Sequence, residues 1–146
     1  LFLGITFNYG LILGWVCIAN QIELVPIIFY IGAIFWTLGF DTIYGYQDIK
    51  DDEIIGVKST SIKFKKNPKL FLIICYSVFM ISLIIVGFFM KFNSMFYLFL
   101  AIPIMHLFLY QIYNLDFKDP ENSLKKFKTN NLLGAIVLFN ILIGKI

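Results

Sequence analysis

The sequence has 146 residues, of which 60% are hydrophobic, 18% aromatic and only 14% charged, and its formal net charge is +3. Soluble domains are about 45 to 50% apolar and about 25% charged, so this composition excludes an ordinary soluble domain and predicts a membrane protein. The twelve basic residues are all lysines and form no basic patch with interleaved aromatic residues, which excludes a nucleic acid as a partner.

Five apolar segments follow one another along the chain. A bilayer core needs about 20 apolar residues, with about 17 to 25 usual. The runs are continuous, without the alternation of a strand, and lipid offers backbone groups no partner outside a helix or a closed barrel. The sequence therefore predicts an all-α, multi-pass transmembrane bundle with spans at about 1–22, 24–45, 70–90, 92–115 and 129–146, and a motif loop at about 46–69.

Lysines gather in two of the connections between these spans. Residues 50–69 hold six lysines and residues 116–128 hold four, whereas the other two turns hold only Lys91. Because lysine-rich loops stay on the cytoplasmic side of a membrane, both connections are expected on that side. The chain starts at Leu1, inside the first apolar run and without flanking charges, so we expect an N-terminally truncated fragment.

Carboxylates crowd into the connection after the second span, where five of the nine acidic residues lie between positions 41 and 53. On one continuous helix, Asp41, Asp48 and Asp52 fall within about 40° of one another, and Asp51 points about 60° to 100° away. Like charges on one stripe repel, which favours a divalent cation as their partner. Carboxylate oxygens completed by phosphate oxygens suit Mg²⁺ better than zinc. Gly45, on the same face, is expected to leave room for a bulky ligand.

A solvated connection is the competing interpretation of this charged segment. Acidic pairs four residues apart are common on the surfaces of helices, so the spacing of Asp48 and Asp52 is weak evidence alone. Asp41 favours a functional site, because it continues an apolar span and a carboxylate at the centre of a membrane helix costs about 2.5 to 3.5 kcal/mol, less near the interface.

The stretch GFDTIYGYQDIKDDEIIGVKSTSIKF, residues 39–64, resembles the second aspartate-rich motif of the UbiA superfamily of intramembrane prenyltransferases. Its DTIYxxQDxxDDxxIGxKST form is most similar to the 4-hydroxybenzoate polyprenyltransferases of that superfamily. The segment LFLGITFNYGLILGW resembles the span that precedes this motif in that family, and FKTNNLLGAIVLF resembles the family's closing helix. The resemblance implies nine helices around a central cavity, of which these five would be the last five, with the first aspartate motif upstream of Leu1.

The resemblance also implies an activity, the transfer of a polyprenyl group from polyprenyl diphosphate to the ring of 4-hydroxybenzoate in ubiquinone biosynthesis, with Mg²⁺ as cofactor. Asp48 and Asp52 would be the metal ligands. Asp41 would act as a further catalytic-site carboxylate that sets cavity polarity or orients a ligand. Lys58, in GVKST, would meet phosphate or the substrate carboxylate as a point cation.

Two alternatives remain open at the level of sequence. One keeps the superfamily but changes the acceptor to a haem, naphthoate or chlorophyll type. The other is an inactive fragment that needs the missing N-terminal half or a complementary chain. A bacterial inner membrane is the expected location, and a mitochondrial inner membrane is the alternative, with the motif loop facing the cytoplasm or the matrix.

Three polar or small-residue features within the spans have simpler interpretations. Gly10 and Gly14 form a small-xxx-small pair that is expected to bring two helices close together. Asn8, shortly before this pair, has two equally weighted interpretations. It forms a hydrogen bond between helices, or it lines a cavity. His106 has no metal-ligating neighbour at three or four residues, so it is expected to form hydrogen bonds within the bundle.

Overall fold

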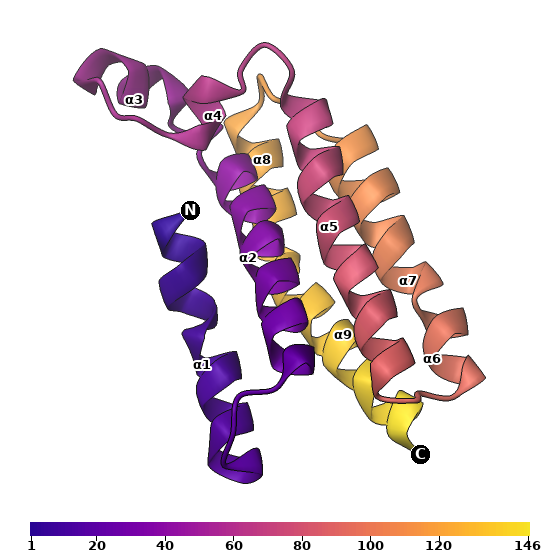
Figure 1. Cartoon of the computed structure of the whole chain (residues 1–146). Coiled ribbons are helices and arrows are strands. Elements are labelled where there is room, and N and C mark those ends of the chain that lie inside the picture. Colours follow the sequence, from indigo (N-terminus) through magenta and orange to yellow (C-terminus); the bar gives the residue numbers. More distant parts are fainter.

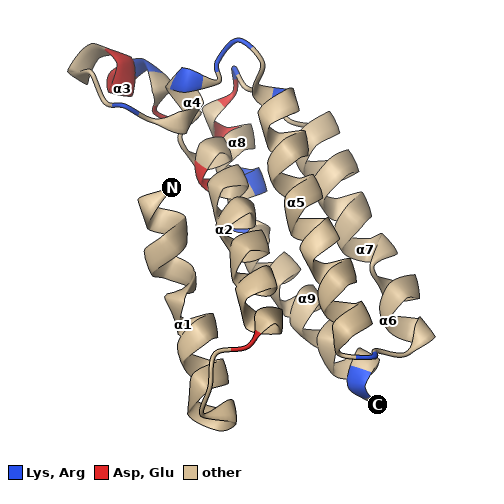
Figure 2. Ribbon diagram, viewed as in Figure 1, with Lys and Arg blue, Asp and Glu red and all other residues tan.

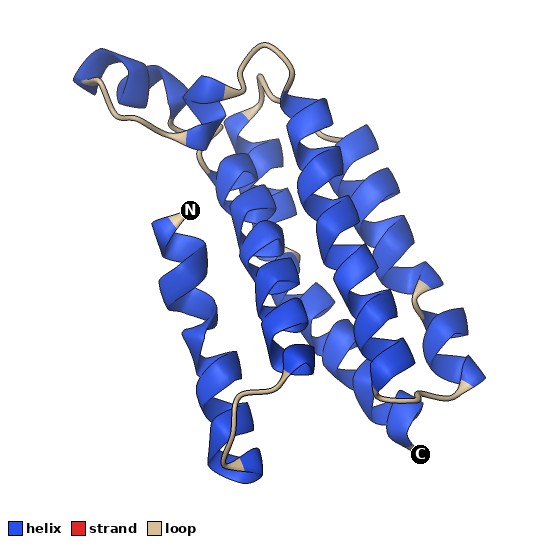
Figure 3. Ribbon diagram, in the orientation of Figure 1, coloured by secondary structure: helices blue, strands red, loops and turns tan.

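Ten helical segments account for most of the chain in the computed structural model, which describes residues 1–146 and contains no strand (Figures 1 and 3). The segments are α1 (Phe2–Ala19), α2 (Leu24–Tyr44), α3 (Ile49–Ile55), α4 (Thr60–Lys63), α5 (Pro68–Phe89), α6 (Ser94–Phe99), α7 (Ala101–Ile104), the π-helix η1 (Met105–Tyr113), α8 (Pro120–Lys128) and α9 (Asn130–Lys145). The all-α prediction is confirmed.

Five stretches of helix are long and apolar enough to cross a membrane, as the sequence predicts. Three are the single helices α1, α2 and α5, whereas the fourth joins α6, α7 and η1 across residues Ser94–Tyr113 and the fifth joins α8 and α9 across Pro120–Lys145. The fifth span begins earlier than predicted. The lysine-rich segment before residue 129 is helical because Asp119 caps it, its carboxylate accepting from the Glu121 N–H, and Pro120 occupies its first turn.

The second span ends one residue before its predicted limit, and the motif that follows is not one loop. Helix α2 stops at Tyr44, residues 45–48 form a turn, and α3 starts at Ile49 with Asp48 at its N-cap position. The assumption of one continuous helix from Asp41 to Asp52 is therefore wrong. Two short helices, α3 and α4, occupy part of the predicted loop at 46–69, and α3 ends where Gly56 takes a positive φ of 78°.

Helices α2 and α5 form the centre of the bundle, because small residues let them approach closely. A Cβ atom added to Gly32 would lie 1.8 Å from the Ser82 Oγ, and one added to Gly39 would lie 2.3 Å from the ring of Tyr76. Lipid tails are as apolar as leucine, so helices in a bilayer associate through this kind of close packing. The buried core around the contact includes Phe79.

Helix α1 stands beside α2 and contributes little to this core (Figure 1). Gly4 is its one buried residue, and a Cβ there would lie 3.1 Å from the Ile34 carbonyl oxygen. Nothing lies within 4 Å of a Cβ added to Gly10 or Gly14. The prediction that this glycine pair brings two helices together is therefore wrong within this chain. Helix α1 approaches α2 closely at Gly4, more than one helical turn before Gly10.

The fourth span is irregular because Pro103 interrupts it. Proline has no N–H for the helical ladder, and its ring collides with the carbonyl four residues back, which here belongs to Phe99, the last residue of α6. Beyond the proline the chain continues as the nine-residue π-helix η1. Such wide turns are rare and occur often at functional sites.

Charged side chains collect at one end of the bundle. Figure 2 shows most acidic and basic positions around α3, α4 and the turn before α8, with a few more at the opposite end, near the start of α2, the connection between α5 and α6, and the C-terminus. The two lysine-rich connections thus lie at the same end of the molecule, which is the arrangement that their composition predicts.

Candidate active site

The four predicted site residues come from three adjoining pieces of the motif. Asp41 lies in the last turn of α2 and is half-buried. Asp48 is exposed at the start of α3, and Asp52 is half-buried within that helix. Lys58 lies in the exposed connection between α3 and α4. The turn at residues 45–48 therefore separates Asp41 from the other two carboxylates.

All four residues nevertheless line one cavity of about 370 Å³, which we call the polar cavity. Its lining is Leu1, Asp41, Tyr44, Gly45, Asp48, Asp52, Lys58, Ser59, Thr60 and Ser61. Asp51 is not part of it and lines a different cavity with Lys50, Lys65 and Lys118, which Asp48 also lines. The three carboxylates thus line one cavity across a turn and a second helix instead of on a single helical face.

The carboxylates of Asp41, Asp48 and Asp52 have no hydrogen-bond donor from the protein, and the chain's one salt bridge is elsewhere, between Lys65 and Glu53 at 2.7 Å. No group of three or more acidic, histidine or cysteine side chains is close enough to hold a metal ion by itself. These unpaired carboxylate oxygens cannot form a complete metal coordination shell from protein atoms alone. Such a donor set fits Mg²⁺, which is usually bound by one or two carboxylates together with substrate phosphates.

Hydroxyl residues that sequence reasoning missed also line the polar cavity. Thr60 and Thr42 hydroxyls lie 2.7 Å apart, and the Ser61 Oγ donates to the Thr42 carbonyl oxygen at 3.0 Å, so α4 is fastened to the end of α2. A Cβ on Gly45 would lie 2.2 Å from that Ser61 Oγ. Gly45 thus makes room for α4 and not for a ligand, which corrects its predicted role; the STS sequence after Lys58 was the available signal.

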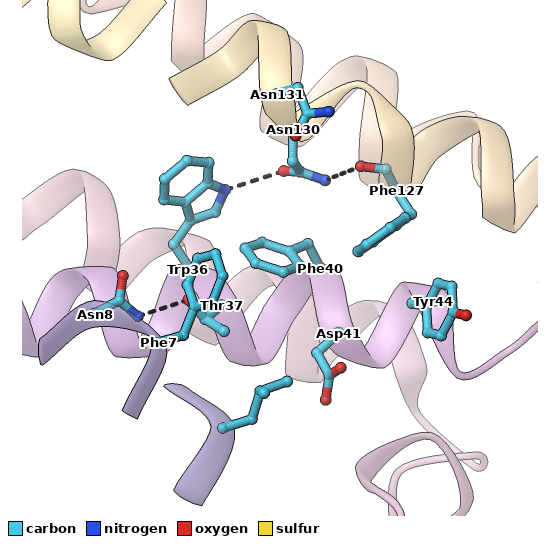
Figure 4. Close-up of a pocket in the computed structure, with 11 residues that line it drawn as sticks. Phe7, Asn8, Trp36, Thr37, Phe40, Asp41, Tyr44, Phe127, Asn130 and Asn131 are labelled. Atoms are coloured by element: carbon cyan, nitrogen blue, oxygen red, sulfur yellow. Dashed lines mark hydrogen bonds between the residues drawn. The ribbon is translucent and has the colours of Figure 1, made fainter. Parts of the chain in front are cut away.

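A second cavity of about 320 Å³ adjoins the first, and Figure 4 shows its lining. We call it the aromatic cavity, because five of its eleven lining residues have aromatic rings. It is lined by Leu3, Phe7, Asn8, Trp36, Thr37, Phe40, Asp41, Tyr44, Phe127, Asn130 and Asn131. Helices α1, α2, α8 and α9 all contribute to it.

The two cavities share Asp41 and Tyr44. One side of this boundary is polar, with two more carboxylates and Lys58, and the other side is aromatic and contains no lysine. A ligand with an anionic head and a long apolar tail matches this division, since its head would meet the polar cavity and its tail would run between the rings.

Asn8 and His106 occupy the places that their sequence context suggests. The Asn8 amide donates to the Thr37 Oγ1 at 2.8 Å and also lines the aromatic cavity, so both of its alternative roles are present. The His106 Nε2 lies 3.1 Å from the Thr129 Oγ1, which confirms its hydrogen bonding within the bundle. Asn130 and Asn131, which also line the aromatic cavity, were not singled out, although both lie in FKTNNLLGAIVLF, a segment quoted for its resemblance to a family span.

Comparisons with known proteins add a family assignment to this geometry. The model of the UbiA prenyltransferase family matches residues 1–134. The 4-hydroxybenzoate polyprenyltransferase of Bos taurus, named as mitochondrial, is 39% identical over 146 residues, and that of Homo sapiens is 40% identical; each match covers 99% of this chain. A 4-hydroxybenzoate geranyltransferase of Lithospermum erythrorhizon is 36% identical over 149 residues.

These relatives are longer than the chain. The matched part is 39% of the bovine and human proteins and 47% of the plant protein. No solved structure matches the chain.

Proposed function

The chain belongs to the UbiA prenyltransferase family, and from that premise we propose that it is part of an enzyme that transfers a polyprenyl group from a diphosphate to the ring of 4-hydroxybenzoate. The names of the bovine, human and plant relatives support both the reaction and the acceptor. We further propose that the five spans are the last five of a nine-helix domain. The activity is that of a whole protein containing this chain.

The observation that carries the proposal is the pair of adjoining cavities. A polyprenyl diphosphate has a highly charged head and an apolar tail, and the junction at Asp41 and Tyr44 separates surfaces suited to each. The allylic carbon, where head and tail meet, would lie near this junction. Aromatic rings there, such as Tyr44 and Phe40, would stabilise the positive charge that develops on that carbon when the diphosphate leaves.

The chain's own residues would hold the diphosphate. Asp48 and Asp52 would bind it through Mg²⁺, which when bound supplies positive charge against the leaving group. Lys58 would add a point charge at the same cavity, and the hydroxyls near Ser59 would offer neutral donors. Asp41, at the boundary, would keep the cavity polar and orient the acceptor, whose phenol hydroxyl makes the neighbouring ring carbon electron-rich enough to attack.

We also propose that the protein lies in an inner membrane with the motif facing the cytoplasm or matrix. The lysine-rich connections support this orientation. The word mitochondrial in the bovine and human names supports the mitochondrial alternative over the bacterial one.

Alanine substitution in the motif tests the proposal. In a complete enzyme containing this chain, Asp48→Ala or Asp52→Ala should lower Mg²⁺-dependent prenylation of 4-hydroxybenzoate by at least about 100-fold, because each removes stabilisation of developing charge. Asp51→Ala is the matched control, since Asp51 does not line the polar cavity, and should cost less than about fivefold. Normal turnover by the Asp48 variant, or an equal loss in the Asp51 variant, would contradict the assignment.

A further inference from the structure

A network of buried side-chain hydrogen bonds extends from the core of the bundle to Trp36, which lines the aromatic cavity. The Trp36 Nε1 donates to the Asn130 Oδ1 at 3.0 Å, and the Gln111 Nε2 donates to the same oxygen at 3.0 Å (Figure 4 shows the Trp36 bond). Gln111 in turn accepts from the Tyr76 hydroxyl. Asn130 is 7% exposed, and Gln111 and Tyr76 are fully buried.

The Asn130 amide is itself fixed on its other side. Its Nδ2 donates to the Phe127 carbonyl oxygen at 2.9 Å, so the Oδ1 is held toward the indole and the glutamine (Figure 4). Polar groups in a site without water are costly when unpaired, and here every member of the group has a partner. A fully paired network of this kind fixes side-chain positions.

The π-helix η1 makes the arrangement possible. On an α-helix, residues five apart point about 140° away from each other. In η1, His106 and Gln111 are five apart, yet the Gln111 Nε2 lies 3.3 Å from the His106 Nε2, and both side chains reach Thr129 at the start of α9. The wider turn therefore brings two polar side chains of one helix onto the same point of another.

Packing holds the Trp36 ring in the orientation that this bond selects. The indole stacks on Phe79, with ring centroids 5.0 Å apart, and Phe40 meets it edge to face at 5.7 Å. Gly134, one turn beyond Asn130, leaves space for the far end of the ring, because a Cβ there would lie 3.4 Å from the Trp36 Cη2. One polar contact and three apolar ones thus determine the ring's position.

We propose that Asn130 is a positioning residue that, with Gln111, fixes Trp36 as the wall of the aromatic cavity against which the first part of the isoprenoid tail is held. Asn130 acts through the indole and not by contact with the reacting atoms. The proposal rests on the proposed prenyl transfer for its catalytic consequence, whereas the positioning itself is a property of this chain.

The positioning is measured first in the complete protein that contains this chain, in lipid nanodiscs. With ¹⁵N-tryptophan labelling, the indole N–H resonance of Trp36 is the one that Trp36→Phe removes. Asn130→Leu should move it upfield through loss of the hydrogen bond, and Asn130→Asp, which keeps an oxygen acceptor, should largely restore it. Asn140→Leu is the control, since Asn140 is buried on the same helix and its Oδ1 has no partner. An unmoved resonance in Asn130→Leu, or an equal shift in the control, overturns the proposal.

The consequence is measured by a double-mutant cycle in the complete enzyme. Asn130→Leu should lower kcat/KM for the prenyl diphosphate about tenfold, the size expected for a lost buried hydrogen bond. In a Trp36→Phe background the same change should cost less than about twofold, because residues that act through each other are not additive. Fully additive losses overturn the proposal. Absence of turnover in the parent enzyme would instead contradict the proposed function, and the resonance would then decide the positioning alone.

Discussion

Tyr46, next to the motif carboxylates, is a buried phenol without a hydrogen-bond partner. Its side chain is 4% exposed, and its ring packs edge to face on Phe117 at 4.9 Å. Burial raises the pKa of Tyr46 to about 12, because the charged phenolate loses solvation. An unfolded chain ionises near pH 10, so between about pH 10 and 12 the unfolded state binds fewer protons than the folded state.

We therefore expect alkaline destabilisation that depends on this residue. The thermal unfolding midpoint, followed by circular dichroism in micelles, should fall as the pH rises from about 10 to 12. Tyr46→Phe should remove part of that fall and raise stability near neutral pH by about 1 kcal/mol, because an unpaired buried hydroxyl is lost. Tyr113→Phe, at a tyrosine that is 75% exposed, should leave the slope unchanged; an identical slope in Tyr46→Phe would contradict the assignment.

At the residue scale, the role predicted for the three motif carboxylates stays a prediction, whereas the single helical face predicted to carry them is wrong. The pattern of Asp41, Asp48 and Asp52 suggested one helical face, and the structure joins the three across a turn. Charge cannot locate that turn, since acidic residues occur in loops and on helix surfaces alike. The amide of Asn130 was not singled out, because it belongs to the polar run KTNN, residues 128–131, which looks like the end of a charged connection.

At the scale of elements, the contact between α2 and α5 depends on the size of one residue. Gly32→Ala should destabilise the bundle by about 1 to 3 kcal/mol, because overpacking forces the backbones apart. The added Cβ would lie 2.6 Å from the Ser82 Cβ, so rotation of the serine hydroxyl cannot relieve the collision. Denaturation with sodium dodecyl sulfate, followed by circular dichroism, measures the effect.

Gly10→Ala provides the comparison for the same chemical change. Its Cβ would meet nothing within 4 Å, and alanine is a better helix former than glycine by about 1 kcal/mol. This variant should be as stable as the parent or more so. If both variants lost a similar amount of stability, the cause would be the loss of glycine's backbone flexibility and not a collision between the two helices.

The existence of the elements was more predictable than their form. Lipid leaves an apolar run of about 20 residues no stable structure except a helix, so the five spans follow from hydropathy. Helix α8 was missed because its sequence, PENSLKKFK, resembles a charged connection, and its helicity depends on the Asp119 cap and on continuation into α9. The π-helix η1 was missed because hydropathy is the same for any helical pitch.

At the scale of the whole molecule, the lysine-rich connections should lie on one side of the membrane. Cysteine variants in a background without Cys17 and Cys75 test this, with a membrane-impermeant maleimide applied to sealed vesicles. Lys63→Cys and Lys118→Cys, both exposed, should react from the same side. Lys145→Cys should react from the other side, and labelling of Lys63→Cys and Lys118→Cys from opposite faces would contradict the five-span topology.

The wide pitch of η1 affects how the chain can tolerate changes in length. If residues 105–113 took α-helical pitch at their present length, His106 and Gln111 would point about 140° apart. Gln111 would then leave Asn130, even though every residue identity at the network was preserved. A related chain with one residue fewer between His106 and Gln111 would have the two side chains four apart, the spacing at which an ordinary α-helix brings them to one face. A one-residue gap here should therefore accompany the loss of the wide pitch, with the network kept.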